Sequence, residues 1–277
     1  KLTGCIFLKC ISSYGGINFS SVYAGEIMYI IYTFSFYDSN GDGTGDFQGI
    51  IEKMEYIKSL GVTTVVLRCI FELTDAIDQF QEEKTDMSKL NPKYGTMEDF
   101  ENLVKAFHDN GIKVLLQNEF QRVYRKHNWI LASEDVNHPE HEKYKDFVKW
   151  TSNPPTVSRN GSVRYNSTRD AYYFAKDSAF AVYLNIENQD VVDEIYNILV
   201  GWINKGIDGF YFTDVGFLIH NYELNEEGTI VNVTTDINKN TDIWSVLIKR
   251  MRDVNENLEF HADFGRTPMS AENFAPS

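Results

Sequence analysis

Hydrophobic positions in this sequence repeat with a period that switches between helical and extended. Between Gln48 and Leu60 the apolar residues recur at helical spacing, which places them on one face of an amphipathic helix: Ile50, Ile51, Met54, Ile57 and Leu60. Gly61 follows, a residue type that commonly ends helices. Residues 62–67 are then rich in β-branched side chains, which predicts a strand. This stretch is a helix–glycine–strand unit.

Similar units recur farther along the chain. Amphipathic helical patterns precede the strands that we predict at 112–116, 209–212 and 258–262. An opening strand at 29–34 brings the number of predicted strands to five. Strands that alternate with helices of this length form a parallel sheet with helical cover. The expected fold class is therefore α/β.

A long polar segment interrupts this pattern. Residues 122–187, called the insert below, are rich in Asn, Ser, Tyr and charged residues, and predict an irregular subdomain after the third strand. Loops at the carboxyl ends of parallel strands are where α/β barrels build their sites. The predicted organisation is an N-terminal tail (1–25), a first barrel part (26–121), the insert (122–187), a second barrel part (188–265) and a C-terminal tail (266–277).

Composition and charge narrow the classes of function. Of the 277 residues, 43% are hydrophobic and 14% are aromatic, which suits a globular protein with a large core. The formal net charge of −14 argues against nucleic acid or an anionic membrane surface as a partner. No apolar run is long enough to cross a bilayer, so we expect no membrane span in this chain.

Cysteines and glycosylation triplets bear on the compartment. Cys5, Cys10 and Cys69 are too few and too unevenly spaced for a disulfide scaffold, and the sequence leaves a single Cys5–Cys10 bridge open. Asn-x-Ser/Thr triplets begin at Asn18, Asn160, Asn166 and Asn232. N-linked glycans are attached to surface segments of secreted proteins. We therefore expect a secreted or extracellular glycoprotein.

A short loop carries the pattern of a cation site. From Asp38 to Asp46, oxygen-bearing residues alternate with other positions, and two of the intervening residues are Gly41 and Gly43. Ca²⁺ accepts six to eight oxygen ligands in flexible geometry. We expect a structural Ca²⁺ held by Asp38, Asn40, Asp42, the Thr44 carbonyl and Asp46. The loop is not an EF-hand, since its twelfth position is Gly49, and the alternative interpretation is a solvated acidic turn.

Several stretches, this loop included, resemble one enzyme family. They look like the landmarks of α-glucosidases and oligo-1,6-glucosidases of glycoside hydrolase family 13, the α-amylase family, in the family's order and spacing. The similar stretches are 29–46, 91–100, 111–116, Tyr183-Leu-Asn185 and Gly206-Ile-Asp-Gly-Phe210. The ectodomains of amino-acid-transporter heavy chains share this fold and are similar as well.

The resemblance implies a (β/α)₈ barrel with a small domain inserted after the third strand. Only the first five β/α units have counterparts in this chain, so the expected architecture is a partial TIM-type barrel. An open sheet exposes edges and an apolar face. We therefore expect another protein chain to complete or cover the barrel, unless the sequence is a fragment.

The resemblance also locates the catalytic positions. Retaining glycosidases need a carboxylate nucleophile and a carboxylic acid about 5 Å apart. Here the nucleophile position holds Thr213, the preceding arginine position holds Tyr211, and the acid/base position is aligned with Ala262. The third-strand positions hold Gln117 and Arg122. We expect an inactive glycosidase relative that acts by binding or assembly, with carbohydrate as one ligand class to test.

Two alternatives keep a different function open. Asp214 and Asp263 each lie one residue beyond an expected carboxylate and could form a shifted catalytic pair, as could residues from a partner chain. Against the shift, side chains alternate along a strand, which predicts that Asp214 points away from the site. The other alternative is a heavy-chain ectodomain of an amino-acid transporter, which requires a membrane-spanning segment upstream.

Overall fold

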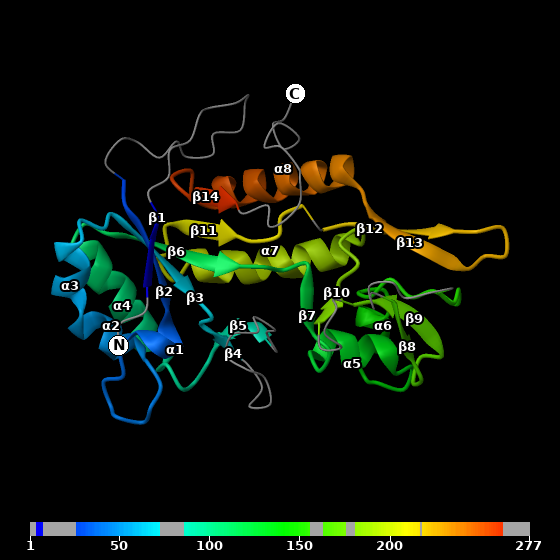
Figure 1. The fold of residues 1–277 in the computed structure, drawn as a ribbon, viewed down its shortest axis with the longest axis horizontal. Helices are drawn as coiled ribbons and strands as arrows, with labels where there is room; N and C mark the ends of the chain where they lie inside the picture. The colour runs from blue at the N-terminus through cyan, green and yellow to red at the C-terminus, as the bar shows by residue number, and fades with distance from the viewer. Residues whose placement is uncertain are drawn as a thin grey trace.

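A six-stranded sheet forms the centre of the molecule (Figure 1). The computed structural model describes residues 4–7, 26–72, 86–155, 163–175, 181–216 and 218–262. Within the sheet the strand order is β1-β2-β3-β6-β11-β14. Five of these strands are parallel to one another: β2 Met28–Tyr32, β3 Thr64–Arg68, β6 Lys113–Asn118, β11 Gly209–Phe212 and β14 Glu259–Ala262. The predicted partial α/β barrel is thereby confirmed.

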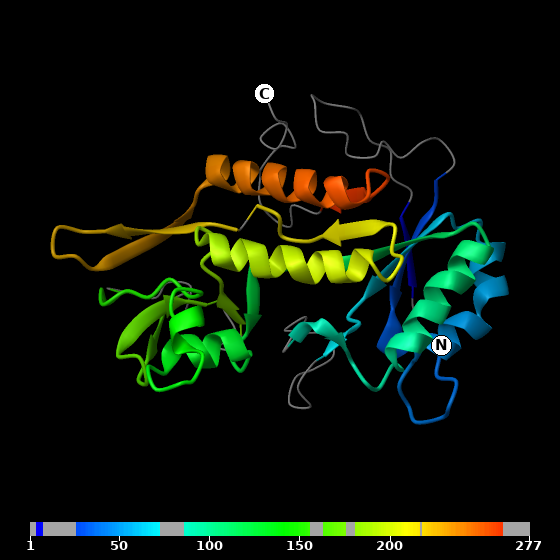
Figure 2. The same ribbon diagram turned by 180° about the vertical axis from the view of Figure 1, so that it is seen from behind.

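Helices connect these strands and pack on one face of the sheet (Figures 1 and 2). The main helices are α2 Phe47–Glu52, α3 Met54–Ser59, α4 Met97–Asp109, α7 Gln189–Ile203 and α8 Ile237–Val254. Local sequence fixes their starts. At α4, the Thr96 hydroxyl accepts from the Asp99 backbone N–H while the Asp99 carboxylate accepts from the Thr96 N–H, a reciprocal capping box.

The opening strand and the first predicted helix are both shorter than expected. The strand predicted at 29–34 ends at Tyr32, and Thr33–Phe36 form a short helix, α1. The helix predicted from Gln48 to Leu60 is divided at Lys53, whose backbone N–H donates to Ile50 O at 3.1 Å. This i→i+3 bond tightens the end of α2, and α3 begins at the next residue.

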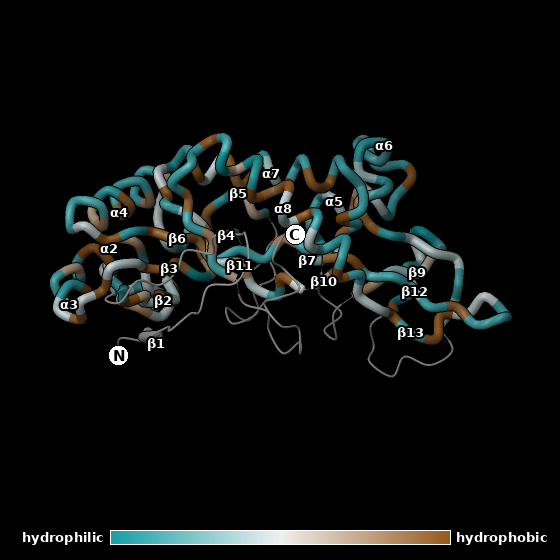
Figure 3. The backbone as a smooth tube through the Cα atoms, turned by 90° about the horizontal axis from the view of Figure 1, so that it is seen from above, coloured by the Kyte–Doolittle hydropathy of each residue, from teal (hydrophilic) through white to brown (hydrophobic). Residues whose placement is uncertain are grey.

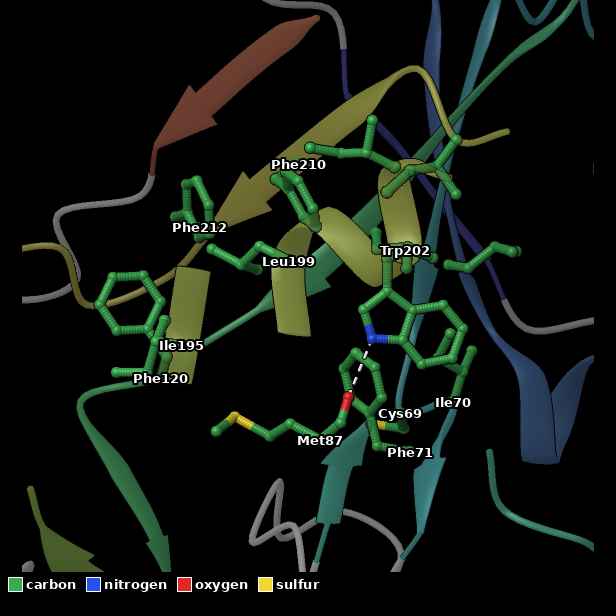
Figure 4. Close-up of a cluster of buried hydrophobic side chains, with 14 of the residues drawn as sticks. Cys69, Ile70, Phe71, Met87, Phe120, Ile195, Leu199, Trp202, Phe210 and Phe212 are labelled. Atoms are coloured by element: carbon green, nitrogen blue, oxygen red, sulfur yellow. Dashed lines mark hydrogen bonds between the residues drawn. The ribbon is translucent and has the colours of Figure 1, made fainter. Parts of the chain in front are cut away.

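The apolar residues between sheet and helices form the main core. The outward side chains of the parallel strands belong to it: Tyr29, Ile31, Val65, Leu67, Val114, Leu116, Phe210, Phe212 and Phe260. Trp202 of α7 lies at its centre (Figure 4), where its indole Nε1–H donates to Met87 O at 2.9 Å. The rings of Phe71 and Phe100 each meet Trp202 edge-on at 5.5 Å. These contacts join two helices to the strands beneath them.

A smaller cluster lies on the opposite, inward face of the sheet. It consists of four buried residues on three adjacent strands: Met28, Ile30, Val66 and Leu115. Their side chains are in phase with one another, since Ile30 pairs with Val66 and Val66 pairs with Leu115. In a closed barrel, side chains in this phase fill the interior.

The insert folds beside the barrel strands (Figures 1 and 2). Its described elements are β7 Arg122–Tyr124, α5 Asn128–Glu134, α6 His141–Tyr144, β8 Val163–Asn166, β9 Ala171–Phe174 and β10 Ala181–Tyr183. β7 pairs with β10 and β8 pairs with β9, both antiparallel. The first and last strands of the insert are therefore neighbours, which closes it as a unit.

Four further strands, which form two antiparallel pairs, had no counterpart in the prediction. β4 Phe71–Glu72 pairs with β5 Asp86–Leu90, and β12 His220–Leu224 pairs with β13 Ile230–Thr235. The β12–β13 hairpin extends past the insert and ends in a hydrophilic tip (Figures 1 and 3). Next to its turn the Ile230 N–H donates to Pro154 O at 2.9 Å, which fastens the hairpin to the insert.

The edge of the sheet at β2 is also covered. Gly4–Phe7 form β1, which pairs antiparallel with β2 and joins Gly4 to Ile31 and Phe7 to Met28. We predicted an N-terminal tail over 1–25, so a sheet strand within that range is a difference from the sequence analysis. A four-residue strand carries too short a pattern to be recognised without its partner.

Candidate functional site

The predicted site residues of the third and fourth barrel strands do come together. β6 and β11 are parallel neighbours in a register that pairs Gln117 with Tyr211. Both side chains face inward, opposite in phase to Phe210 and Phe212 of the helix-facing core. Just beyond β11, the Thr213 N–H donates to Asn118 O at 3.2 Å, which extends the contact to the carboxyl ends of the strands. Loops at these ends are where barrels of this type place their chemistry.

Thr213 has an amide as its neighbour. The Gln117 Nε2 donates to Thr213 Oγ1 at 3.3 Å, and Gln117 itself is 3% exposed. An amide cannot take the hydroxyl proton, so this contact does not activate Thr213 as a nucleophile. A neutral hydroxyl and a neutral amide also supply no negative charge opposite an oxocarbenium ion.

Arg122 forms the centre of an ionic cluster next to these residues. Its guanidinium contacts the Glu119 carboxylate closely, with Nη2 2.7 Å from Glu119 Oε2, and its Nη1 lies 3.3 Å from Asp214 Oδ2. The side chains of Arg122 and Glu119 are only 11% and 4% exposed. Burial by itself would lower the pKa of Arg122, but Glu119, Tyr183 and Asp214 outweigh it, and that pKa is raised. The cluster holds one cation and two carboxylates.

Asp214 differs from the expectation that strand alternation gave. The strand ends at Phe212, and Asp214 adopts the left-handed backbone conformation with φ 54°. This conformation, unusual for a residue other than glycine, breaks the alternation. The Asp214 carboxylate therefore lies against Arg122. The outward direction that we predicted from strand alternation was wrong for this residue. The signal that could have found this contact was the charge pattern of Glu119, Arg122 and Asp214.

Ala262 also differs from its predicted place. On β14, Tyr211 pairs with His261 and Phe212 pairs with Ala262. Ala262 therefore shares the phase of Phe212 and packs against the helix-facing core, while His261 faces inward. An alanine on that face does not occupy an acid/base position, so the alignment behind the prediction was one residue out of phase. Asp263 lies outside the described residues.

The loop from Asp38 to Asp46 curls around its own acidic side chains. The two Asp38 carboxylate oxygens accept from the backbone N–H groups of Asn40, Gly41 and Gly43 at 2.7–3.2 Å. Its N–H donors, Gly43 above all, lower the pKa of Asp38, so the group is ionised at neutral pH. The Asp42 N–H donates to Asn40 Oδ1 at 2.9 Å and the Thr44 N–H to Asp42 Oδ1 at 2.8 Å.

Asp46 is engaged elsewhere in the same loop. Its carboxylate caps α2 through Gly49 N at 2.6 Å and accepts from the Ser39 hydroxyl at 2.8 Å. Throughout the described part of the chain, no three acidic, His or Cys side chains form a group of the kind that holds a metal. The oxygen ligands expected for Ca²⁺ are thus present in sequence order, but the side chains of Asp38, Asn40, Asp42 and Asp46 all also accept hydrogen bonds from the protein. The fit to Ca²⁺ is partial.

The other predicted positions lie in separate parts of the chain. Asn232 lies exposed on β13, and its Nδ2 donates to Glu223 Oε2 at 3.0 Å. The Asn166 Oδ1 accepts from the N–H groups of Thr168 and Arg169, both at 2.9 Å, so Asn166 holds the β8–β9 turn. Asn18 and Asn160 lie outside the described residues, as does Cys10. Cys69 is a free, buried cysteine.

The geometry now defines a class: the first part of a glycosidase-type (β/α) barrel, with its inserted subdomain. The comparisons with known proteins agree. Residues 30–268 match the family model described as the alpha amylase catalytic domain. The chain therefore belongs to the α-amylase family.

Among curated relatives, the amino acid transporter heavy chain SLC3A1 of Homo sapiens is 35% identical over 212 residues, which is 72% of this chain and 30% of that protein. The oligo-1,6-glucosidase of Bacillus cereus is 31% identical over 218 residues, 74% of this chain and 38% of that protein. Maltase A1 of Drosophila melanogaster is 33% identical over 69% of this chain and 34% of its own length. The chain thus spans about a third of the length of these relatives.

Solved structures share the fold. The trehalose-6-phosphate hydrolase of Bacillus licheniformis superposes with a TM-score of 0.73 at 24% identity, over 88% of this chain and 45% of that one. The α-amylase from H. orenii gives a TM-score of 0.69 at 29% identity, over 85% of this chain and 46% of that one. Among the helices that the structure describes, none is long and apolar enough to cross a membrane.

Proposed function

We propose that this α-amylase-family domain is catalytically inactive and acts by binding or assembly. The observation that carries the proposal is the pairing at the carboxyl ends of β6 and β11. Thr213 accepts a hydrogen bond from Gln117, and Asp214 pairs with the Arg122 guanidinium that also binds Glu119. The described part of this site therefore offers no carboxylate positioned as the nucleophile of a retaining mechanism.

The electrostatics of the ionic cluster support the same conclusion. A retaining glycosidase stabilises a cationic transition state with a carboxylate on the opposite face of the sugar ring. Here Asp214 is held in an ion pair with Arg122, which is buried and also binds Glu119, so this carboxylate is already engaged by a protein cation. Moving Arg122 away would leave the nearly buried Glu119 without its cation, which is costly.

Turnover of p-nitrophenyl α-glucoside tests the proposal. We expect none above the background of buffer, for the wild type and for Asp214→Asn alike. Turnover that Asp214→Asn or Asp263→Asn abolishes would establish the alternative, an active α-glucosidase with shifted carboxylates. Turnover that persists in both variants, but only with a copurifying chain, would assign the activity to residues of that partner.

The proposal also covers the location of the protein, its metal ion, its partner chain, its glycosylation and its ligand. It includes a secreted or extracellular location, a structural Ca²⁺ at the Asp38–Asp46 loop, and a second chain that completes or covers the open barrel. Of the two described triplets, that of Asn232 would be the better glycan acceptor, because its side chain is exposed on a hairpin whereas Asn166 supports a turn. Carbohydrate is the ligand class to test first.

A second candidate function is that of a transporter heavy-chain ectodomain. It is favoured by the 35% identity to the human amino acid transporter heavy chain over 72% of this chain. Such a role requires an anchor that precedes the barrel in the complete precursor. Sequencing the full transcript decides the matter, since a precursor with no membrane-spanning segment upstream of the barrel would eliminate this candidate.

A further inference from the structure

The central sheet ends at β14 in an unpaired edge. β14 pairs with β11 on one side, and none of the strands that the structure describes pairs with its other side. At the opposite end of the sheet, β1 covers the edge of β2. An edge strand presents a row of N–H and C=O groups that can pair with a strand of another chain. Because the described sheet has one unpaired edge, such pairing would join two molecules and then stop.

The backbone of β14 determines which residues would make the new hydrogen bonds. The Glu259 N–H donates to Asp208 O at 2.9 Å, so the backbone groups of Glu259 point toward β11. Along a strand, successive residues point their N–H and C=O groups to alternate sides. The backbone groups of Phe260 therefore point to the unpaired edge, and those of His261 point back toward β11.

Two side chains of β14 carry buried polar atoms that need a partner. Glu259 Oε2 and His261 Nε2 are inaccessible to solvent, and neither has a hydrogen-bond partner within the described part of the chain. The two atoms lie 3.6 Å apart, just beyond hydrogen-bonding distance, on the same face of the strand. His261 and Lys113 lower the pKa of Glu259, so its carboxylate is ionised at neutral pH. A buried polar atom without a partner is costly, and a strand with complementary groups would remove that cost.

The order of residues along β14 is complementary to itself. A two-fold axis perpendicular to the sheet keeps the helix-covered faces of both copies on one side and passes through one residue of the strand. If that residue is Phe260, each Glu259 lies opposite His261 of the second copy and each Leu258 opposite Ala262. An axis at Glu259 or at His261 would instead place two carboxylates or two imidazoles opposite each other. Opposite charges across a strand pair stabilise it and like charges destabilise it.

We infer that two copies of this chain pair antiparallel through β14, with Phe260 on the two-fold axis. The Phe260 N–H and C=O groups then bond to those of the second copy. The flanking Glu259–His261 pairs occupy the non-hydrogen-bonded positions, where opposite side chains approach most closely. Each carboxylate thus gains an imidazole N–H of the second copy. The inference rests on the assembly part of the proposed function and identifies the second chain as a copy of the first.

Sedimentation velocity with the full chain tests this pairing. The wild type should sediment as a dimer, at twice the 31.9 kDa of one chain. His261→Glu places carboxylates opposite one another and should raise the Kd of the dimer by at least about tenfold. Exchanging the two residues, Glu259→His together with His261→Glu, restores complementary pairs in the same register and should recover most of the affinity. Glu256→Gln, at an exposed position before β14, is the control and should dimerise as the wild type does.

Disulfide cross-linking tests the register independently of affinity. Non-hydrogen-bonded partners in antiparallel strands have Cα atoms about 4.5 Å apart, which a disulfide can span. The double variant Glu259→Cys with His261→Cys should therefore form a covalent dimer under mild oxidation, seen on a non-reducing gel. Glu256→Cys with His261→Cys, whose positions are not opposite in this register, should give no more covalent dimer than the wild type with its native cysteines. Circular dichroism checks that each variant is folded.

The outcomes separate this inference from the rest of the proposed function. A native particle with one copy of the chain, alone or with a different chain, would overturn the inference. So would a dimer whose Kd His261→Glu leaves unchanged, or equal cross-linking of the two cysteine pairs. A particle with a different chain would leave assembly itself in place. Glucoside turnover by the dimer would refute the proposed lack of catalysis and leave the pairing through β14 unaffected.

Discussion

At the scale of single residues, Arg122 determines much of the character of the barrel site. Its side chain is only 11% exposed and contacts two carboxylates from different segments, Glu119 beside β6 and Asp214 beyond β11. A buried ion pair contributes little net stability compared with an apolar pair, but removing one partner leaves a buried charge unpaired. The cluster is therefore sensitive to the loss of any member.

Arg122→Met should lower the free energy of unfolding by about 3–5 kcal/mol, because Glu119 would then be buried without its cation. Urea denaturation followed by circular dichroism measures the change. The control is Lys105→Met, which breaks the exposed Lys105–Asp109 pair and should change the free energy by less than about 1 kcal/mol. Equal effects of the two substitutions would mean that the Arg122 cluster is hydrated in solution.

Two histidines should make the protein less stable in mild acid. Burial lowers the pKa of His127 to about 4 and that of His220 to about 3, both from 6.5. Between about pH 4 and 6.5 the unfolded chain binds protons at these residues and the native chain does not, so stability falls as the pH falls. The slope is at most about 1.4 kcal/mol per pH unit for each histidine, and full stability is present above pH 6.5.

Denaturation curves at several pH values between 4.5 and 7.5 check this expectation. Replacing both histidines by Gln should flatten the dependence above pH 4.5, where most carboxylates of the unfolded chain are already ionised. His138→Gln, at a partly exposed position of the insert, is the control and should leave the slope unchanged. An unchanged slope in the double variant would show that other groups cause the acid sensitivity.

Sequence patterns were informative for residues on regular strands and uninformative just beyond them. The alternation along β11 correctly placed Tyr211 inward and Phe210 and Phe212 toward the helices. It failed at Asp214 because a left-handed backbone angle there, φ 54°, is set by the loop and leaves no mark in hydrophobic periodicity. Ala262 was misplaced for a different reason, a register error of one residue, which reverses the face of every side chain on a strand.

At the scale of elements, the helix–glycine–strand units were the most predictable feature. Three of the four units have a glycine after the amphipathic helix, and Gly61, Gly111 and Gly206 all have positive φ where the helix ends. The β12–β13 hairpin was not predicted because its strands lack a clean alternation. Its position depends on a tertiary contact, Ile230 N–H to Pro154 O, that no local pattern encodes.

The acidic loop between α1 and α2 gives a prediction at this scale. If Ca²⁺ binds there, EDTA should lower the melting temperature, and Asp42→Ala should remove that sensitivity, because bound metal stabilises the native state by mass action. A saturating concentration near a hundred times Kd corresponds to about 2.7 kcal/mol. Differential scanning fluorimetry with and without EDTA measures the shift. A wild type that melts at the same temperature in both buffers contradicts a calcium site in this loop.

At the scale of the whole molecule, the sheet has five parallel strands where a closed barrel of this type has eight. The chain's mass is 31.9 kDa. If a second chain completes or covers the barrel, the native particle should be heavier than one chain and its expected glycans. Native mass spectrometry of the protein from its source measures this directly. A particle that contains one copy of this chain and nothing else would contradict the expected partner.

The short strand β1 has a consequence for how any such completion proceeds. In a closed barrel the last strand pairs with the first. It would therefore have to hydrogen-bond to the backbone groups on the edge of β2 that faces away from β3. Those groups are taken, because residues Gly4–Phe7 lie antiparallel along Met28–Ile31. An arriving strand and β1 therefore compete for one position, and closure requires strand exchange. While Gly4–Phe7 stay paired with β2, the sheet cannot close at this edge.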